Sequence, residues 1–181
     1  MRIVLIILGL LLSHPPARAI DLEETRELAN SGDAWYQTEL ALMYHRGQGI
    51  TKDYDEAAKW YRLAAEQGFS KAQANLGVMY GEGHGVPQDY AEAARWFRLA
   101  AEQGNALAQH NLGLLYGTGK GVEQDCAEAY VWESLAAASG HREAAKNRDI
   151  CLAKLSDEQL KAARRRESFL YLKIEQRKRS Q

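Results

Sequence analysis

A nine-residue segment recurs at a fixed spacing of 36 residues, and this repetition constrains the fold more than any other feature of the sequence. The segment reads WYRLAAEQG at residues 60–68, WFRLAAEQG at 96–104 and WESLAAASG at 132–140. Self-similarity at a period of roughly 20–50 residues indicates a repeat architecture, in which each supersecondary unit stacks on the next. Laid out at this period, the chain gives three complete rows, at residues 34–69, 70–105 and 106–141.

Each row contains two segments with the apolar spacing of an amphipathic helix. In the first segment of the second row, Leu76, Met79 and Tyr80 recur at i, i+3 and i+4. The second segment of the first row has Ala57, Trp60 and Ala64 on one stripe. Apolar residues at these intervals lie on one face of a helix, which predicts a helical hairpin in every row.

The residues around the second helix of each row support this prediction. Asp53, Asp89 and Asp125 precede it, and Glu56, Glu92 and Glu128 follow three residues later. This is the spacing of a capping box, in which the Asp accepts first-turn amides and the Glu reaches back to the cap amide. Glycines at 68, 104 and 140 suit the left-handed residue that closes a helix.

The ends of the stack depart from the repeat pattern. Residues 20–33 correspond to a second helix without its first, and we expect an N-terminal capping helix there. Residues 142–155 begin a fourth row that turns polar, and Ser156–Gln159 offers another capping box. We expect residues 156–181 to form a basic, solvent-facing capping helix that packs partly through four apolar residues: Phe169, Leu170, Leu172 and Ile174.

The first 19 residues have the composition of a secretory signal peptide. Arg2 precedes an apolar run at residues 3–12, and Ala17-Arg18-Ala19 has the small-x-small pattern of a cleavage site. The run is about half the length of a membrane span. We therefore expect cleavage before Ile20 and a periplasmic or secreted protein, with an uncleaved anchor as the alternative.

The co-occurring positions of the rows resemble the Sel-one-like repeat (SLR) family, which is related to tetratricopeptide repeats. The second row carries the pattern most fully, in the run from Ala72 through Asn75-Leu76-Gly77 to Gly104. The first row departs from it with Glu39 and Ala41. This resemblance covers residues 33–155 and implies an all-α, right-handed α/α solenoid of about three full helix pairs. It also implies a bacterial protein-interaction adaptor whose first helices line a concave face.

The charge distribution argues against a nucleic-acid-binding surface along the repeats. Residues 20–155 contain 13 basic and 20 acidic residues, whereas residues 156–181 contain eight basic and four acidic ones. An acidic repeat body repels phosphates. The basic C-terminal helix is either a solvated cap or a weak contact for anionic lipid, peptidoglycan or an acidic partner.

We predict that the protein is not an enzyme and that it has no cofactor or metal site. The acidic residues recur in phase and are explained by capping, and four histidines (His45, His84, His110 and His141) have no metal-ligand spacing. The glycines of residues 81–89 join two helices and lack the Lys-Ser/Thr of a phosphate loop. The alternatives are a cell-envelope hydrolase or β-lactam-binding protein, for which we find no asymmetric polar cluster, and a structural spacer.

A protein or peptide partner is predicted to bind the concave face. Asn75, Asn111 and Asn147 form a ladder of one residue per row, and asparagine offers paired donors and acceptors to a peptide backbone. The alternative is that these asparagines bond only within their hairpins. The predicted binding residues are Gln37, Lys71, Asn75, Leu107, His110, Asn111 and Asn147.

The two cysteines permit one disulfide bond. Cys126 begins the second helix of the third row, and Cys151 ends the next, antiparallel helix, so the two side chains can meet. An oxidising compartment favours a bridge. Two buried, unpaired thiols are the alternative.

Overall fold

The computed structural model describes residues 21–180, so the predicted signal peptide at 1–19 lies outside the described residues. Within this range the chain forms nine helices and no strand. Their bounds are α1 (Leu22–Asn30), α2 (Ala34–Arg46), α3 (Tyr54–Glu66), α4 (Ser70–Glu82), α5 (Tyr90–Ala101), α6 (Ala106–Thr118), α7 (Cys126–Ala138), α8 (Ala144–Leu152) and α9 (Asp157–Arg179).

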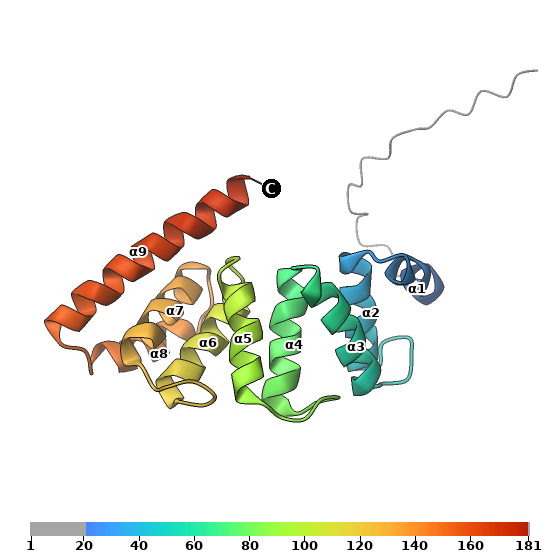
Figure 1. The fold of residues 1–181 in the computed structure, drawn as a ribbon, viewed down its shortest axis with the longest axis horizontal. Helices are drawn as coiled ribbons and strands as arrows, with labels where there is room; N and C mark the ends of the chain where they lie inside the picture. The colour runs from blue at the N-terminus through green and yellow to red at the C-terminus, as the bar shows by residue number, and fades with distance from the viewer. Residues whose placement is uncertain (1–20, 181) are drawn as a thin grey trace, which may run out of the picture.

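Successive helices pack as antiparallel pairs along one axis of the molecule (Figure 1). The hairpins α2–α3, α4–α5 and α6–α7 correspond to the three rows, and each packs on the next through a second helix and the following first helix. The protein is therefore an all-α solenoid. None of the described helices is both long and apolar enough to cross a membrane.

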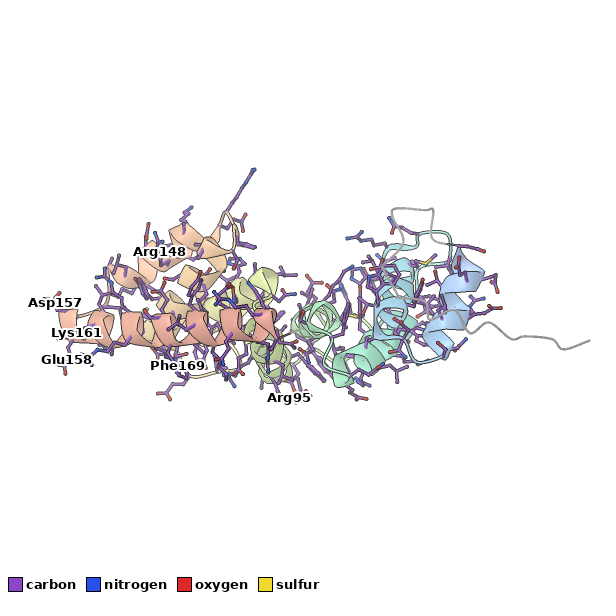
Figure 2. The ribbon with its side chains drawn as sticks, turned by 90° about the horizontal axis from the view of Figure 1, so that it is seen from above. Arg95, Arg148, Asp157, Glu158, Lys161 and Phe169 are labelled. Carbon is purple, nitrogen blue, oxygen red and sulfur yellow. The ribbon has the colours of Figure 1, made fainter. Side chains whose placement is uncertain are left out.

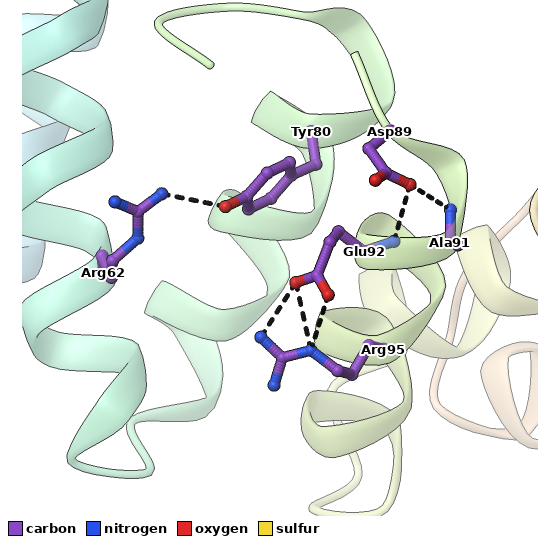
Figure 3. Close-up of polar contacts among 6 residues, drawn as sticks. All are labelled: Arg62, Tyr80, Asp89, Ala91, Glu92 and Arg95. Carbon is purple, nitrogen blue, oxygen red and sulfur yellow. Dashed lines mark hydrogen bonds and ion pairs between the residues drawn. The ribbon is translucent and has the colours of Figure 1, made fainter. Parts of the chain in front are cut away.

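The predicted aspartate caps are present, but the glutamates three residues later act differently. Asp89 Oδ1 accepts hydrogen bonds from the amides of Ala91 at 2.8 Å and Glu92 at 3.0 Å (Figure 3). Glu92 instead pairs with Arg95 at 2.9 Å, because the cap amide of Asp89 already donates to the carbonyl of Tyr80 at 2.9 Å. The full capping box forms only at Ser156 and Gln159, among the helices described.

Small residues let the paired helices approach closely. A Cβ atom at Gly77 would lie 2.7 Å from the ring of Phe97, so this glycine is required by the packing of α4 on α5. Buried alanines such as Ala64 and Ala100 fill the same role on the second helices. The core is consequently made of alanines interleaved with single large side chains, of which Tyr61 and Trp132 are the bulkiest fully buried ones.

Two kinds of polar contact join each row to its neighbour. Arg62 of α3 donates to the hydroxyl of Tyr80 in α4 at 2.8 Å, and Arg98 donates to Tyr116 at 2.7 Å (Figure 3 shows the first pair). Gln73 of α4 donates to the carbonyl of Ala65 at the end of α3. These bonds fix the register of one hairpin on the next and satisfy carbonyls that the helix ends leave free.

The C-terminal helix α9 packs along α7 rather than pairing with α8, and it runs back toward the middle of the stack (Figure 1). Leu170 and Ile174 are buried against the repeats, whereas Phe169 and Leu172 are 64% and 66% exposed. The expectation that all four apolar residues pack on the last repeat is therefore half wrong. A helix in contact along one side can bury only one stripe.

The outward side of α9 is uncovered over its length (Figure 2). Lys161, Arg165 and Arg179 fall on the same helical face as Leu172, opposite the buried stripe. The cations nearer the repeats are paired: Arg166 contacts Glu128, and Lys173 lies 3.9 Å from Glu102. Ion pairs between α9 and the acidic repeats therefore form on the side of α9 that faces the repeats, and the outward cations are not part of them.

Candidate binding face

The first helices α4, α6 and α8 lie side by side, because α6 contacts both α4 and α8 directly. On these helices the residues at i, i+4 and i+7 share one side and are exposed or half-buried. We call this surface the first-helix face and define it by six residues: Lys71, Asn75, Leu107, Asn111, Leu114 and Ile150.

The first-helix face becomes more apolar toward the C-terminal end of the stack. On α4, Lys71 is exposed and pairs with Glu39 at 2.6 Å, and Asn75 is half-buried. On α6 and α8, Leu107, Leu114 and Ile150 are all exposed. Sequence reasoning missed Leu114 and Ile150, although both stand one turn beyond the asparagine of their row.

The asparagine ladder is only partly used inside the fold. Asn111 Nδ2 donates to the carbonyl of Leu107 one turn earlier at 2.9 Å, which leaves its side-chain oxygen available. Asn147 Nδ2 lies 3.2 Å from Glu133 Oε1 and donates to it. Asn111 and Asn147 therefore share a helical position and differ in what they contact.

Gln37 does not lie on the first-helix face, which corrects the prediction. Its side chain is buried, donates to the carbonyl of Ala29 at 3.2 Å and accepts a hydrogen bond from Gln67 at 2.7 Å. Gln73 repeats the arrangement, with Ala65 as its acceptor and Gln103 as its donor. The glutamine at this position donates to a carbonyl at the end of the preceding helix in every row. Its role is therefore structural.

His110 is also buried, at 6% exposure, and belongs to a polar cluster that occurs only in the third row of the described chain. Its Nδ1 lies 2.9 Å from Oε2 of Glu133, a carboxylate that is only 1% exposed. His141 stacks on the His110 ring with centroids 4.1 Å apart. The expectation that the sequence holds no asymmetric polar cluster is therefore wrong.

The protonation of this cluster is set mainly by burial. Burial raises the pKa of the Glu133 carboxyl, and the hydrogen bonds from His110 and Asn147 partly offset the rise. Burial also lowers the pKa of His141, and the nearby His110 lowers it further. The signal for the cluster was present in the sequence, because Glu133 occupies the position that Tyr61 and Phe97 hold in the other rows.

A cavity of about 150 Å³ opens beside Glu133 between α6 and α8. Three small residues, Gly113, Gly117 and Ala129, are among those that line it. Leu114 and Ile150 of the first-helix face lie at its rim. The cavity therefore connects the first-helix face to the buried carboxylate.

Cys126 and Cys151 are both free thiols and lie next to each other. Burial raises the pKa of Cys151 to about 12, and the hydrogen-bonded Cys126 thiol contributes to the rise. A thiol with this pKa stays protonated and is a poor nucleophile. The adjacency that a disulfide requires is present, and the bridge itself remains a prediction.

The part of the chain that the structure describes contains no group of three or more His, Cys, Asp or Glu side chains placed to hold a metal ion. His84 stacks on Tyr54 with ring centroids 4.3 Å apart, and His45 packs edge-on against the same tyrosine. His84 therefore joins the second row to the first through its ring, whereas His45 contacts Tyr54 within the first row. Both histidines pack against Tyr54, at the junction between the first and second rows.

Comparison with known proteins identifies the repeat and several relatives. The Sel1 repeat model matches residues 36–69, 70–105 and 106–141. A 54-residue stretch is 44% identical to the secretory immunoglobulin A-binding protein EsiB of Escherichia coli O6:H1, covering 30% of this chain and 11% of EsiB. The chain thus spans about a tenth of this curated relative.

Two solved structures resemble this one over most of its length. The crystal structure of c5321, a protective antigen of uropathogenic Escherichia coli with an SLR fold, has a TM-score of 0.66 at 46% identity and covers 69% of this chain and 27% of c5321. A Sel1 repeat protein from Oxalobacter formigenes has a TM-score of 0.65 at 41% identity and covers 71% of this chain and 97% of its own. The repeat matches, the helical architecture and these likenesses agree that the chain belongs to the Sel1 repeat family.

Proposed function

We propose that this protein is an exported, non-catalytic scaffold that binds a protein or peptide on its first-helix face. The observation that carries the proposal is the exposure of Leu107, Leu114 and Ile150 on neighbouring first helices. Clustered exposed leucine and isoleucine side chains favour a partner that removes them from water. EsiB is named for binding an immunoglobulin, which agrees with protein binding by a relative of this fold.

The asparagines give this face polar specificity. Asn75 of α4 and Asn111 of α6 occupy equivalent positions on neighbouring first helices. On α6, Asn111 lies one turn from Leu107 and one turn from Leu114. A peptide laid across α4 and α6 could exchange backbone hydrogen bonds with both amides. Lys71 adds a positive charge at the α4 end of the face, with Glu39 beside it.

A photo-crosslinking experiment tests the proposal in cells. A photoreactive amino acid at Leu107, which is 40% exposed on a first helix, is compared with one at Leu63, which is 45% exposed on a second helix. The proposal predicts a specific adduct at Leu107 that disappears in the Asn75→Ala/Asn111→Ala double variant. Equal adducts at both sites, or an adduct indifferent to the asparagines, would contradict it.

A catalytic role for the third-row cluster is less well supported. His110 and Glu133 form a pair typical of acid–base chemistry. However, both side chains are buried, and the thiol beside them, Cys151, is held protonated by its raised pKa of about 12. These properties favour a binding or structural role over a hydrolase or β-lactam-binding site.

We further propose that the basic helix α9 makes a weak contact with anionic envelope components. Phe169 and Leu172 are exposed on a helix whose outward face also carries Lys161, Arg165 and Arg179. Apolar side chains flanked by cations are typical of helices that lie in an anionic lipid interface. Export through the predicted signal peptide would bring α9 to such a surface.

A further inference from the structure

The third row differs from the other two at one core position. Tyr61 and Phe97 fill this position with buried rings, and Glu133 replaces them. A Cβ atom at Gly77 would meet the Phe97 ring at 2.7 Å, and one at Gly113 would meet the Glu133 side chain at 2.7 Å, so Glu133 lies against α6 where the ring lies in the second row. The carboxylate side chain is smaller than a ring, and a cavity, which we call the slot, lies beside it.

The space beside Glu133 has the size of a single aromatic ring. Its volume is about 150 Å³, and a buried cavity of roughly this volume binds benzene in another protein. The side chains of Leu114 and Ile150 at the rim are 37% and 51% exposed, so a ring can enter from the first-helix face. The small residues Gly117 and Ala129 line the cavity together with Gly113, which the Glu133 side chain contacts.

The walls of the cavity favour a neutral hydrogen-bond donor. Each oxygen of Glu133 accepts one hydrogen bond, from His110 or Asn147. A carboxylate has about four acceptor sites, so it can accept another donor. Lys154 also lines the cavity, and its positive charge disfavours a second cation.

We propose that this cavity receives the ring of a tyrosine side chain from the partner, with the phenol hydroxyl donating to Glu133. This inference rests on the proposed binding function and names the partner side chain that would be buried in the cavity. The buried carboxylate, held by His110 and Asn147, gives the slot a preference for tyrosine over phenylalanine, since an apolar ring would leave that acceptor capacity unused.

The side-chain analogue p-cresol tests the slot without knowledge of the partner. Titration of the full chain, followed by amide chemical shifts, should give saturable changes at Gly113, Gly117 and Ala129. Toluene should bind at least about fivefold more weakly, because it lacks the hydroxyl donor. Absence of saturation, shifts elsewhere in the chain, or equal binding of the two compounds would overturn the proposal.

Two variants separate filling of the slot from loss of its acceptor. Glu133→Phe restores the residue of the second row and should abolish binding of both compounds. Glu133→Gln keeps the shape and weakens the acceptor, so the preference for p-cresol over toluene should fall toward one; a preference equal to the wild type would refute the role of the carboxylate. The Leu99→Ala variant, at an exposed site on α5, is the control and should bind p-cresol like the wild type.

The crosslinking experiment keeps this inference distinct from the proposed function. An asparagine-dependent adduct at Leu107 together with no binding of p-cresol would overturn the tyrosine slot alone. Saturable p-cresol binding at the slot with no such adduct would overturn binding along the asparagine ladder and leave the slot supported.

Discussion

Gly85 of the second row lies directly against the backbone of Tyr54 in the first. A Cβ atom at residue 85 would be 2.0 Å from the Tyr54 carbonyl oxygen, and the residue has a φ of +65°. Gly121 repeats this contact with Tyr90, where the nearest backbone atom would be 2.2 Å away. The turns of the second and third hairpins therefore pack directly on the first turn of the second helix one row earlier.

Replacement of Gly85 by alanine should weaken the stack strongly. The added methyl group meets backbone atoms that cannot rotate away, and the left-handed conformation adds strain, so we expect a loss of about 3 kcal/mol in the free energy of unfolding. Gly68→Ala is the control, because Gly68 has a φ of +90° and open space around its Cβ position. It should lose about 1 kcal/mol. Equal losses in urea denaturation would show that the close approach contributes nothing.

Replacement of Ser139 by glutamine should stabilise the third row. Ser139 stands where Gln67 and Gln103 stand, and those side chains donate to Gln37 and Gln73. The equivalent acceptor, Gln109 Oε1, is buried and has no hydrogen-bond partner. A glutamine at 139 can supply the missing donor, for a gain of about 1 kcal/mol.

The matched variant Ser139→Ala tests whether any change at this exposed site has the same effect. It removes the hydroxyl and supplies no donor, so its unfolding midpoint should stay near that of the wild type. A gain from alanine equal to that from glutamine would mean that the open acceptor is not the cause.

The periodic features of the chain were predictable, and the features that break the period were not. The helical hairpins follow from repeated apolar stripes and from caps such as Asp89. Glu133 was overlooked because its environment depends on His110 and Asn147, which lie 23 and 14 residues away in the sequence. These side chains meet only when α6 and α8 pack on α7. Gln37 was assigned to the surface because a polar residue on a first helix resembles a binding residue until its partners are known. The position of α9 along α7 likewise depends on tertiary contacts.

The Glu133 carboxyl should make stability depend on pH. Its pKa is raised by burial in the folded chain, so the folded state binds the proton more tightly than the unfolded state. The stabilisation is fully present below the ordinary glutamate pKa of 4.5 and is lost as pH rises through the raised value. Glu133→Gln removes this dependence.

Urea denaturation of both forms at a series of pH values measures the effect. The free energy of unfolding of the wild type should fall relative to Glu133→Gln as pH rises above 4.5. The same titration of His141 occurs in both proteins, so it cancels in the difference. A difference that is constant with pH, or that changes in the opposite direction, would contradict the prediction.

Exported protein should contain a disulfide bond between Cys126 and Cys151. The thiols are adjacent, and closing this loop should add about 3 kcal/mol to the free energy of unfolding by the chain-entropy model. Intact mass without reductant should be lower by two hydrogens than the mass after reduction. The Cys126→Ala variant should match the reduced wild type in stability. Recovery of two alkylated thiols from unreduced, denatured protein would refute the bridge.

The outward face of α9 should bind anionic vesicles. We expect sedimentation with vesicles of phosphatidylglycerol and phosphatidylcholine, and partitioning that falls about tenfold in the Phe169→Ala/Leu172→Ala variant, because two exposed apolar side chains are lost. The control Leu63→Ala/Leu99→Ala removes two exposed leucines from second helices and should bind like the wild type. Added salt should weaken binding by screening. Equal binding to purely phosphatidylcholine vesicles would contradict a charge-dependent contact.

The bonds that Gln73, Gln103 and Arg62 make to a neighbouring row each cross a single row boundary. A copy of the first or second row, made in frame, would meet the original with the same donors facing the same acceptors. In-frame duplication of 36 codons, by unequal crossing-over within the gene, can therefore lengthen the protein and its first-helix face without any compensating mutation at the new joint.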